Sequence, residues 1–269
     1  MKVKRELVEF YPIPTFSIEE ILDDPEKHAF NICAATMFPG QLRMDGSRDS
    51  LVAWGGFKTT QSAQLMLGTL RPSGVGSKVC QDIAVKRFYI RNKTPPANES
   101  GASQDILKRL DLQNKSPPAI DVKNLRFSRF TIADELDKLY REANVLYWAK
   151  SLFQLTYDFI DRAVGKATTP PPFNIPQLRF MDAGLLLAIK SSSVKAPSAV
   201  NVQTPYLAEE LITCDEPFVK YIHNGDPTPM PEPYEPGYDI AQFLAFTQHV
   251  QYVKTGGLAY ISDYQGKQD

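Results

Sequence analysis

The stretch YDIAQFLAFTQHVQYVKTGGLAYISDYQG, residues 238–266, decides the fold of the C-terminal part of the chain. Apolar residues recur at helical spacing through its first half, which predicts an amphipathic helix. Asp239 is expected to cap the N-terminus of this helix, with Gln242 as the second half of a capping box. Gly256-Gly257 predicts the C-terminal end, because a left-handed residue after a helix is most often glycine.

The second half of the stretch predicts a short strand over residues 258–261, with Asp263 and Gln265 where the chain leaves the sheet. A carboxylate and a carboxamide two residues apart, beside a glycine, offer oxygen ligands for a metal ion or a partner for a substrate hydroxyl. Taken alone, Asp263 is more often a simple turn residue, since Asp and Gly commonly end strands.

The composition of the whole chain excludes several classes of protein. Its 269 residues suffice for one large domain or two lobes with a shared core. A net charge of −1 gives no reason to expect nucleic acid or an anionic membrane as a partner. The three cysteines are far apart, the N-terminus lacks a signal peptide, and no apolar run could span a bilayer. We therefore expect an intracellular, cytoplasmic protein.

The first half of the chain predicts a sheet. Residues 1–30 contain prolines and a short acidic helix, and we expect them to be peripheral. Short β-like runs broken by glycines follow at 51–54, 63–70 and 82–90, which predicts an antiparallel sheet. Polar residues and two Pro-Pro pairs then predict a mobile insertion over 93–118.

The remainder of the chain predicts one long helix and further strands. Apolar residues trace one helical face over 132–164, and Gly165 with the prolines after it ends the pattern. Two β segments are expected at 185–190 and 200–207. A sheet, then a long helix, then strands and a last helix indicate an α+β fold.

Lys86 is a candidate for chemistry because of its place in the run DIAVKRFYI. On periodicity alone it is an exposed lysine on the polar face of an edge strand. The functional alternative is a lysine held by a rigid strand, where its charge could neutralise nucleotide phosphates.

Three motifs together resemble the alpha-type (atypical) protein kinases, most closely their fungal branch. These are the run AVKR, the run YLAEELI followed by FVKY, and the helix ending in GGLAYISDYQG, in which His249 precedes Asp263 by fourteen residues. The resemblance implies a two-lobed protein-kinase-like fold. Its N-lobe, residues 31–205, would be mainly an antiparallel sheet, and its C-lobe, residues 206–269, would be mixed and truncated.

The resemblance also implies the roles of individual residues. Asp263 would be catalytic, orienting the attacking hydroxyl or accepting its proton, and Gln265 would bind Mg²⁺. His249 would bind Zn²⁺. The implied ATP-binding residues are Lys86, Glu209, Arg48, Lys220 and Asn224.

The chain departs from this family after Gly266, where only three residues follow. A second metal-binding Asp and the other zinc ligands are therefore missing, and Zn²⁺ is expected only in a complete chain. The expected function is transfer of the ATP γ-phosphoryl group to a Ser or Thr hydroxyl of a protein substrate, with Mg²⁺. The alternative is a catalytically impaired kinase-like module that binds a nucleotide or a protein. The sequence leaves the oligomeric state open.

Overall fold

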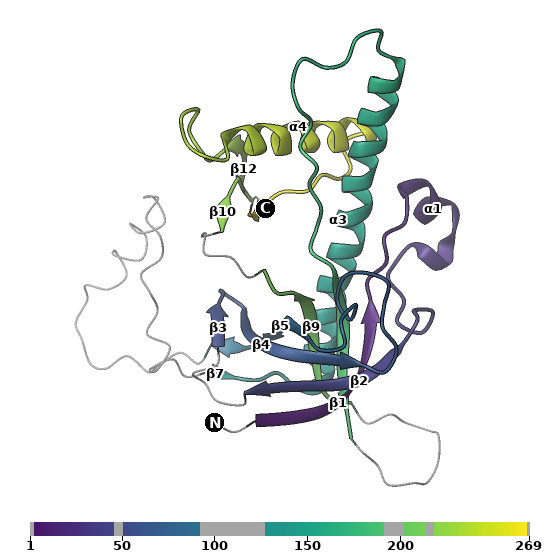
Figure 1. The fold of residues 1–269 in the computed structure, drawn as a ribbon, viewed down its shortest axis with the longest axis vertical. Helices are drawn as coiled ribbons and strands as arrows, with labels where there is room; N and C mark the ends of the chain where they lie inside the picture. The colour runs from purple at the N-terminus through teal and green to yellow at the C-terminus, as the bar shows by residue number, and fades with distance from the viewer. Residues whose placement is uncertain (1–2, 46–50, 92–126, 191–201, 213–217, 268–269) are drawn as a thin grey trace, which may run out of the picture.

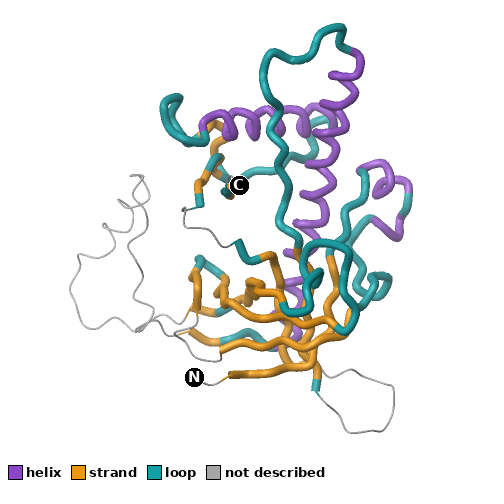
Figure 2. The backbone as a smooth tube through the Cα atoms, viewed as in Figure 1, coloured by secondary structure: helices purple, strands orange, loops and turns teal. Residues whose placement is uncertain are grey.

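A computed structural model describes residues 3–45, 51–91, 127–190, 202–212 and 218–267. Figure 1 shows a strand-rich body, a long helix that runs beside it, and a smaller C-terminal part at the far end of that helix. The same division is clear in Figure 2, where the strands gather in one half of the molecule.

The strand-rich body is a closed antiparallel β-barrel of six strands, built in the order β2-β1-β8-β9-β5-β4 and closed by pairing of β2 with β4. A seventh strand, β3, extends the sheet from β4. The strands are β1 Val3–Pro12, β2 Phe38–Asp45, β3 Leu51–Trp54, β4 Lys58–Leu67, β5 Gln81–Phe88, β8 Ala183–Ile189 and β9 Val202–Glu210.

Alternate side chains of the barrel strands point inward and form the first core, because successive residues of a strand face opposite sides of a sheet. Apolar side chains dominate this interior, and they include Val8, Phe10, Leu42, Leu65, Ile83, Val85, Leu186 and Ala208. The barrel therefore contains a packed core in place of a channel.

The long helix α3, Ile132–Lys166, covers part of the outer face of the barrel. Thr131 begins it as the N-cap, accepting a hydrogen bond from the backbone N–H of Asp134. Outward-facing barrel residues such as Leu185 and Leu207 pack with Leu139 and Tyr147 of α3 in a second core. The short helix α1, Ile18–Asp23, contributes Ile21 and has a complete capping box.

The C-terminal part forms a third core around the other end of α3. The helix α4, Tyr238–Lys254, packs Ala241 and Leu244 against Phe153 of α3 and Tyr264. Small two-stranded ladders accompany it: β10 Val219–Lys220 with β13 Gln265–Gly266, and β11 Ile222–His223 with β12 Asp226–Pro229. A further ladder, β6 Ile90–Arg91 with β7 Phe127–Ser128, lies at the edge of the barrel part. The short 3₁₀ helix η1, Pro25–Lys27, follows α1.

These observations confirm the α+β class, the antiparallel sheet and the long helix, which runs two residues past its predicted end at 164. The expectation that residues 1–30 are peripheral was wrong for β1, which lies between β2 and β8 in the barrel. The predicted lobe boundary at 205/206 falls inside β9. The predicted mobile insertion, 93–118, lies outside the described residues.

Two local predictions in the C-terminal part were also wrong. Gly237 caps α4 in place of Asp239, and Gln242 instead donates a hydrogen bond to the Tyr238 hydroxyl. Residues 258–261 form a loop and not a strand. The predicted end of the helix is confirmed, since Gly256 and Gly257 both have positive φ.

Candidate functional site

Lys86 and Glu209 form an ion pair on the outer face of the barrel. Lys86 lies on β5 and Glu209 on the neighbouring strand β9, and Lys86 Nζ is 2.5 Å from Glu209 Oε2. The Glu209 side chain is buried, whereas that of Lys86 is about a quarter exposed. The structure therefore brings together two residues that the sequence predicted to share a site.

The register of the two strands explains this pairing. Lys86 lies opposite Leu207, and Glu209 lies opposite Ala84, so the two charged residues are diagonal neighbours on one face. The intervening Val85 points into the barrel core. Because β5 has β4 on one side and β9 on the other, Lys86 is not on an edge strand, as the simpler sequence interpretation supposed.

Lys220, Asp263 and Gln265 meet on the small β10–β13 ladder. Lys220 pairs with Gln265 across the ladder, and its Nζ lies 2.8 Å from Asp263 Oδ1. Both charged side chains are partly exposed, so this carboxylate is accessible from solvent. Asp263 has φ 61°, a left-handed conformation that is uncommon for a residue with a side chain. Asp adopts this conformation more readily than most residues with a side chain, because its short polar side chain can form local hydrogen bonds.

The buried polar side of α4 holds the segment that leads to Asp263. Gln251 is fully buried, and its Oε1 accepts a hydrogen bond from the Ile261 N–H at 2.8 Å. Gln248 donates to the Ile261 carbonyl at 2.7 Å. The Tyr264 hydroxyl contacts Thr247 at 3.2 Å and Gln251 at 3.4 Å. Burial raises the pKa of Tyr264 above its ordinary 10.0, an effect that outweighs the hydrogen bonds from Thr247 and Gln251.

The other predicted site residues do not join either pair. Asn224 lies exposed at the turn between β11 and β12. His249 is on the exposed side of α4, although the sequence placed it on a half-buried helix as a zinc ligand. Arg48 lies outside the described residues. Within the described part of the chain, no three His, Cys, Asp or Glu residues are arranged to hold a metal ion.

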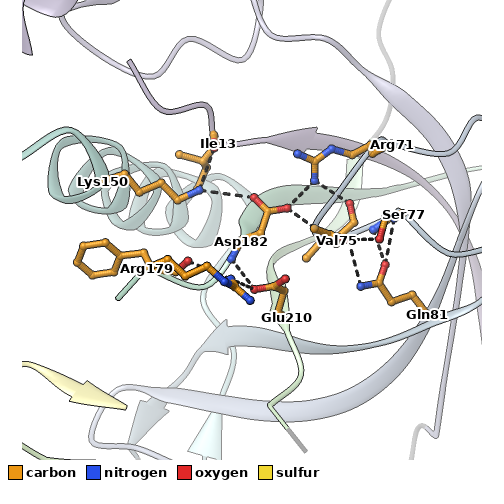
Figure 3. A network of polar contacts seen from close by, with 12 residues as sticks. Ile13, Arg71, Val75, Ser77, Gln81, Lys150, Arg179, Asp182 and Glu210 are labelled. Carbon is orange, nitrogen blue, oxygen red and sulfur yellow. Dashed lines mark hydrogen bonds and ion pairs between the residues drawn. The ribbon is translucent and has the colours of Figure 1, made fainter. Parts of the chain in front are cut away.

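A third charged cluster, which sequence reasoning missed, surrounds Asp182 at the start of β8 (Figure 3). Its Oδ2 accepts hydrogen bonds from Arg71 Nη1 at 2.6 Å and from the Val75 N–H at 2.8 Å. Lys150 Nζ, from α3, lies 3.6 Å from Asp182 Oδ1 and donates to the Ile13 carbonyl at 3.1 Å. Asp182 thus joins α3, the barrel and the turn at residues 74–76.

Glu210 extends this cluster toward solvent. Its carboxylate accepts hydrogen bonds from Arg179 and from the Asp182 N–H, at 2.6 and 2.9 Å. The cluster borders a groove of about 470 Å³ that is also lined by the aromatic residues Phe153, Tyr157 and Phe180. Burial lowers the pKa of Lys150, an effect that outweighs the attraction of Asp182. The Gly74-Val75-Gly76 turn was the one sequence signal of this cluster.

The chain matches no protein-family model, and no curated protein matches it. Among the described residues, no helix is long and apolar enough to cross a membrane. The features of the structure that bear on function are therefore the two ion pairs, Lys86 with Glu209 and Lys220 with Asp263.

Proposed function

We propose that this protein is an ATP-dependent protein serine/threonine kinase of the alpha-kinase type. One observation carries the proposal: Lys220, Asp263 and Gln265, which the resemblance assigns to one site, come together on the β10–β13 ladder. In this proposal the barrel is the N-lobe, and α4 with the small ladders is the C-lobe. Such an enzyme would work inside the cell, where the exposed cysteines Cys33 and Cys80 stay reduced.

Each residue has a definite role in the proposed reaction. Lys86 would place its ammonium on the phosphates of ATP, with Glu209 holding the lysine in position. Asp263 would orient the hydroxyl of the protein substrate, and its accessible carboxylate allows a protein chain to approach. The left-handed backbone at Asp263 fixes the direction in which the carboxylate is presented.

The donor atoms of Asp263, Gln265 and His249 can be compared with the ligands that Mg²⁺ and Zn²⁺ require. The Asp263 carboxylate and the Gln265 amide supply oxygen ligands, which Mg²⁺ prefers, and Mg²⁺ commonly binds to only one or two protein groups plus phosphates. Bound there, Mg²⁺ would neutralise charge on the phosphates. His249 lacks companion ligands among the described residues, so the site does not fit Zn²⁺, which needs about four.

A second candidate is a kinase-like module that binds a nucleotide or a protein without catalysis. The charges of both pairs favour it, since Lys86 is neutralised by Glu209 and Asp263 by Lys220. A nucleotide with its metal must compete with these internal partners. Binding and phosphoryl transfer therefore need separate measurements.

The test is a pair of assays on the full chain: fluorescence-detected binding of a labelled ATP analogue with Mg²⁺, and transfer of labelled phosphate to a basic protein. We expect Lys86→Met to weaken nucleotide affinity at least about tenfold, and Asp263→Asn to abolish transfer while retaining binding. Lys58→Met is the matched control, because Lys58 is another strand lysine, 2.5 Å from Glu142 and similarly exposed.

The outcomes distinguish the candidates. Binding without transfer in the unmodified chain identifies the binding module. If Lys86→Met and Lys58→Met reduce binding equally, the phosphate role of Lys86 is wrong. A chain that neither binds nucleotide nor transfers phosphate overturns the proposal.

A further inference from the structure

A long apolar stripe runs along one side of α3 and lines a groove to which neither of the two ion pairs contributes a residue. Trp148, Leu152, Leu155 and Phe159 are spaced four, three and four residues apart, so they lie on one face of the helix. Together with Arg162 and Lys166 they form the floor of a groove of about 880 Å³. We refer to it as the α3 groove.

The walls of the α3 groove come from two distant parts of the chain. At one end α1 contributes Ile18, Glu19 and Leu22. At the other, the end of α4 and the loop after it contribute Lys254, Thr255, Leu258 and Ala259. Figure 1 shows α1 beside α3 and α4 crossing α3 farther along, with contacts between both pairs of helices.

The apolar surface of the α3 groove is open to solvent. Leu258 is 90% exposed and Leu22 is 61% exposed, although both are large aliphatic residues in described segments. Removing such side chains from water on binding is favourable. An apolar patch of this kind, bordered by polar residues, is typical of a protein interaction site.

The charges around the groove are asymmetric. Arg162, Lys166 and Lys254 gather at the end formed by the C-terminal turns of α3 and α4, and none of them takes part in an ion pair with a described residue. Lys254 lies 4.7 Å from the centre of the Phe159 ring, and Arg162 Nε donates to the Asp158 carbonyl. Glu19 is at the opposite end. The basic end is therefore suited to carboxylates from outside.

We propose that the α3 groove binds an amphipathic helix from a partner protein. The partner helix would insert large apolar side chains at i, i+4 and i+7 between α1 and Leu258, and would carry acidic residues at the end near Lys166 and Lys254. The floor from Trp148 to Lys166 is about 27 Å long at 1.5 Å per residue, which accommodates four to five turns of helix. This proposal does not depend on kinase activity.

The experiment uses a displayed library of helical peptides about four turns long, selected on the full chain and counter-selected on a groove variant. The groove variant is Leu258→Asp, chosen because this exposed loop side chain can be replaced without unfolding the protein. The charge variant is Lys166→Glu with Lys254→Glu. The control is Val145→Asp, an exposed residue of α3 that does not line the groove.

We expect the selected peptides to share the i, i+4, i+7 apolar spacing and an acidic end. Their affinity should fall at least about tenfold with either the groove variant or the charge variant and stay unchanged with the control. Thermal unfolding verifies that each variant is folded. For the charge variant, exchanging the acidic residues of the peptide for lysine should restore binding.

Other results overturn the proposal. Peptides that lack this pattern, or that bind all variants equally, show that the groove is not the site. If no peptide is enriched on the unmodified chain relative to the groove variant, the groove is likewise not a binding site for a helix. If sedimentation shows self-association that Leu258→Asp abolishes, the occupant is a second copy of the chain. Loss of vesicle binding in the charge variant, without peptide binding, indicates a lipid surface.

Discussion

Lys86 Nζ lies 2.5 Å from Glu209 Oε2 across two neighbouring barrel strands, so the barrel itself fixes the distance between these two residues. Glu209 is buried by its surroundings and cannot easily exchange this partner for water. Measuring the interaction between Lys86 and Glu209 therefore tests both the register of β5 with β9 and the proposed site.

We expect a double-mutant cycle to reveal the strength of this pair. Glu209→Gln and Lys86→Met should each lower the free energy of unfolding by about 1–3 kcal/mol, because each leaves a partly buried group without its partner. The coupling energy should be about 0.5–3 kcal/mol, measured by urea unfolding. Additive effects would show that the two side chains do not interact in solution.

Asp182 should matter more for stability, because it accepts from Arg71 and Val75 and faces Lys150. Asp182→Asn leaves Arg71 and Lys150 without a carboxylate partner. We expect the substitution to lower the free energy of unfolding by about 2–4 kcal/mol. The measurement is chemical denaturation. Asp137→Asn is the control, because Asp137 forms an exposed helical pair with Arg141 and should change stability by less than about 0.5 kcal/mol. Equal losses in both variants would contradict the network.

The pH dependence of stability should carry a signature of Lys150. Because burial lowers its pKa below the ordinary 10.5, the unfolded chain binds more protons than the folded one between the two values. Stability due to this group therefore rises as pH increases through that window. We expect the unfolding free energy of the unmodified chain minus that of Lys150→Met to increase as the pH rises toward 10.5. A difference that stays flat or falls would mean that Lys150 is well hydrated.

Two glycines with positive φ should respond differently to alanine. A Cβ at Gly74 would meet Asp182 Oδ2, whereas one at Gly256 has no neighbour within 4 Å. Gly256→Ala should cost only the backbone penalty of about 1–2 kcal/mol. Gly74→Ala should cost about 1–3 kcal/mol more, because it displaces the Asp182 carboxylate from its donors. Thermal and urea unfolding measure the loss of stability in both variants. Similar losses would show that the Asp182 carboxylate does not lie against Gly74.

Gln251→Leu tests how the segment before Asp263 is held. The substitution removes the acceptor of the Ile261 N–H and should cost about 1–3 kcal/mol in unfolding free energy. Hydrogen exchange at the Ile261 amide should become faster, as measured by mass spectrometry. The control, Gln242→Ala, changes an exposed residue of the same helix and should leave this exchange rate unaltered. Unchanged protection in Gln251→Leu would argue that other groups position the loop.

The features predicted well from the sequence depend on local patterns. The apolar residues of α3 recur at helical spacing, and Gly256-Gly257 marks the end of α4, although the buried side of α4 is partly polar. The pairing of Lys220 with Asp263 was not predicted: the resemblance assigned Lys220 to ATP binding and Asp263 to catalysis, and nothing local joins residues so far apart. Periodicity places elements, but it does not say which elements become neighbours.

The errors have a common physical origin in long-range contacts. β1 contains charged residues and a proline, yet Glu6, Val8 and Phe10 alternate inward once β8 supplies a neighbour. Residues 258–261 are apolar enough for a strand, but Gln248 and Gln251 satisfy the backbone of Ile261 in place of a partner strand. Asp182 itself gave no signal because its partners come from three separate segments: the turn with Arg71 and Val75, Lys150 in α3, and Glu210 at the end of β9.

Closure of the barrel also constrains how this chain can be synthesised. β1 leaves the ribosome well before its partner β8, which begins only at Ala183, and β9 must follow to join β8 to β5. During translation the edges of β1 and β5 that will pair with β8 and β9 therefore remain unpaired while α3 is synthesised. Pairing between such distant segments is intrinsically slow. We expect nascent chains that stop before Glu210 to be recognised by chaperones, and native structure to appear only after that residue emerges.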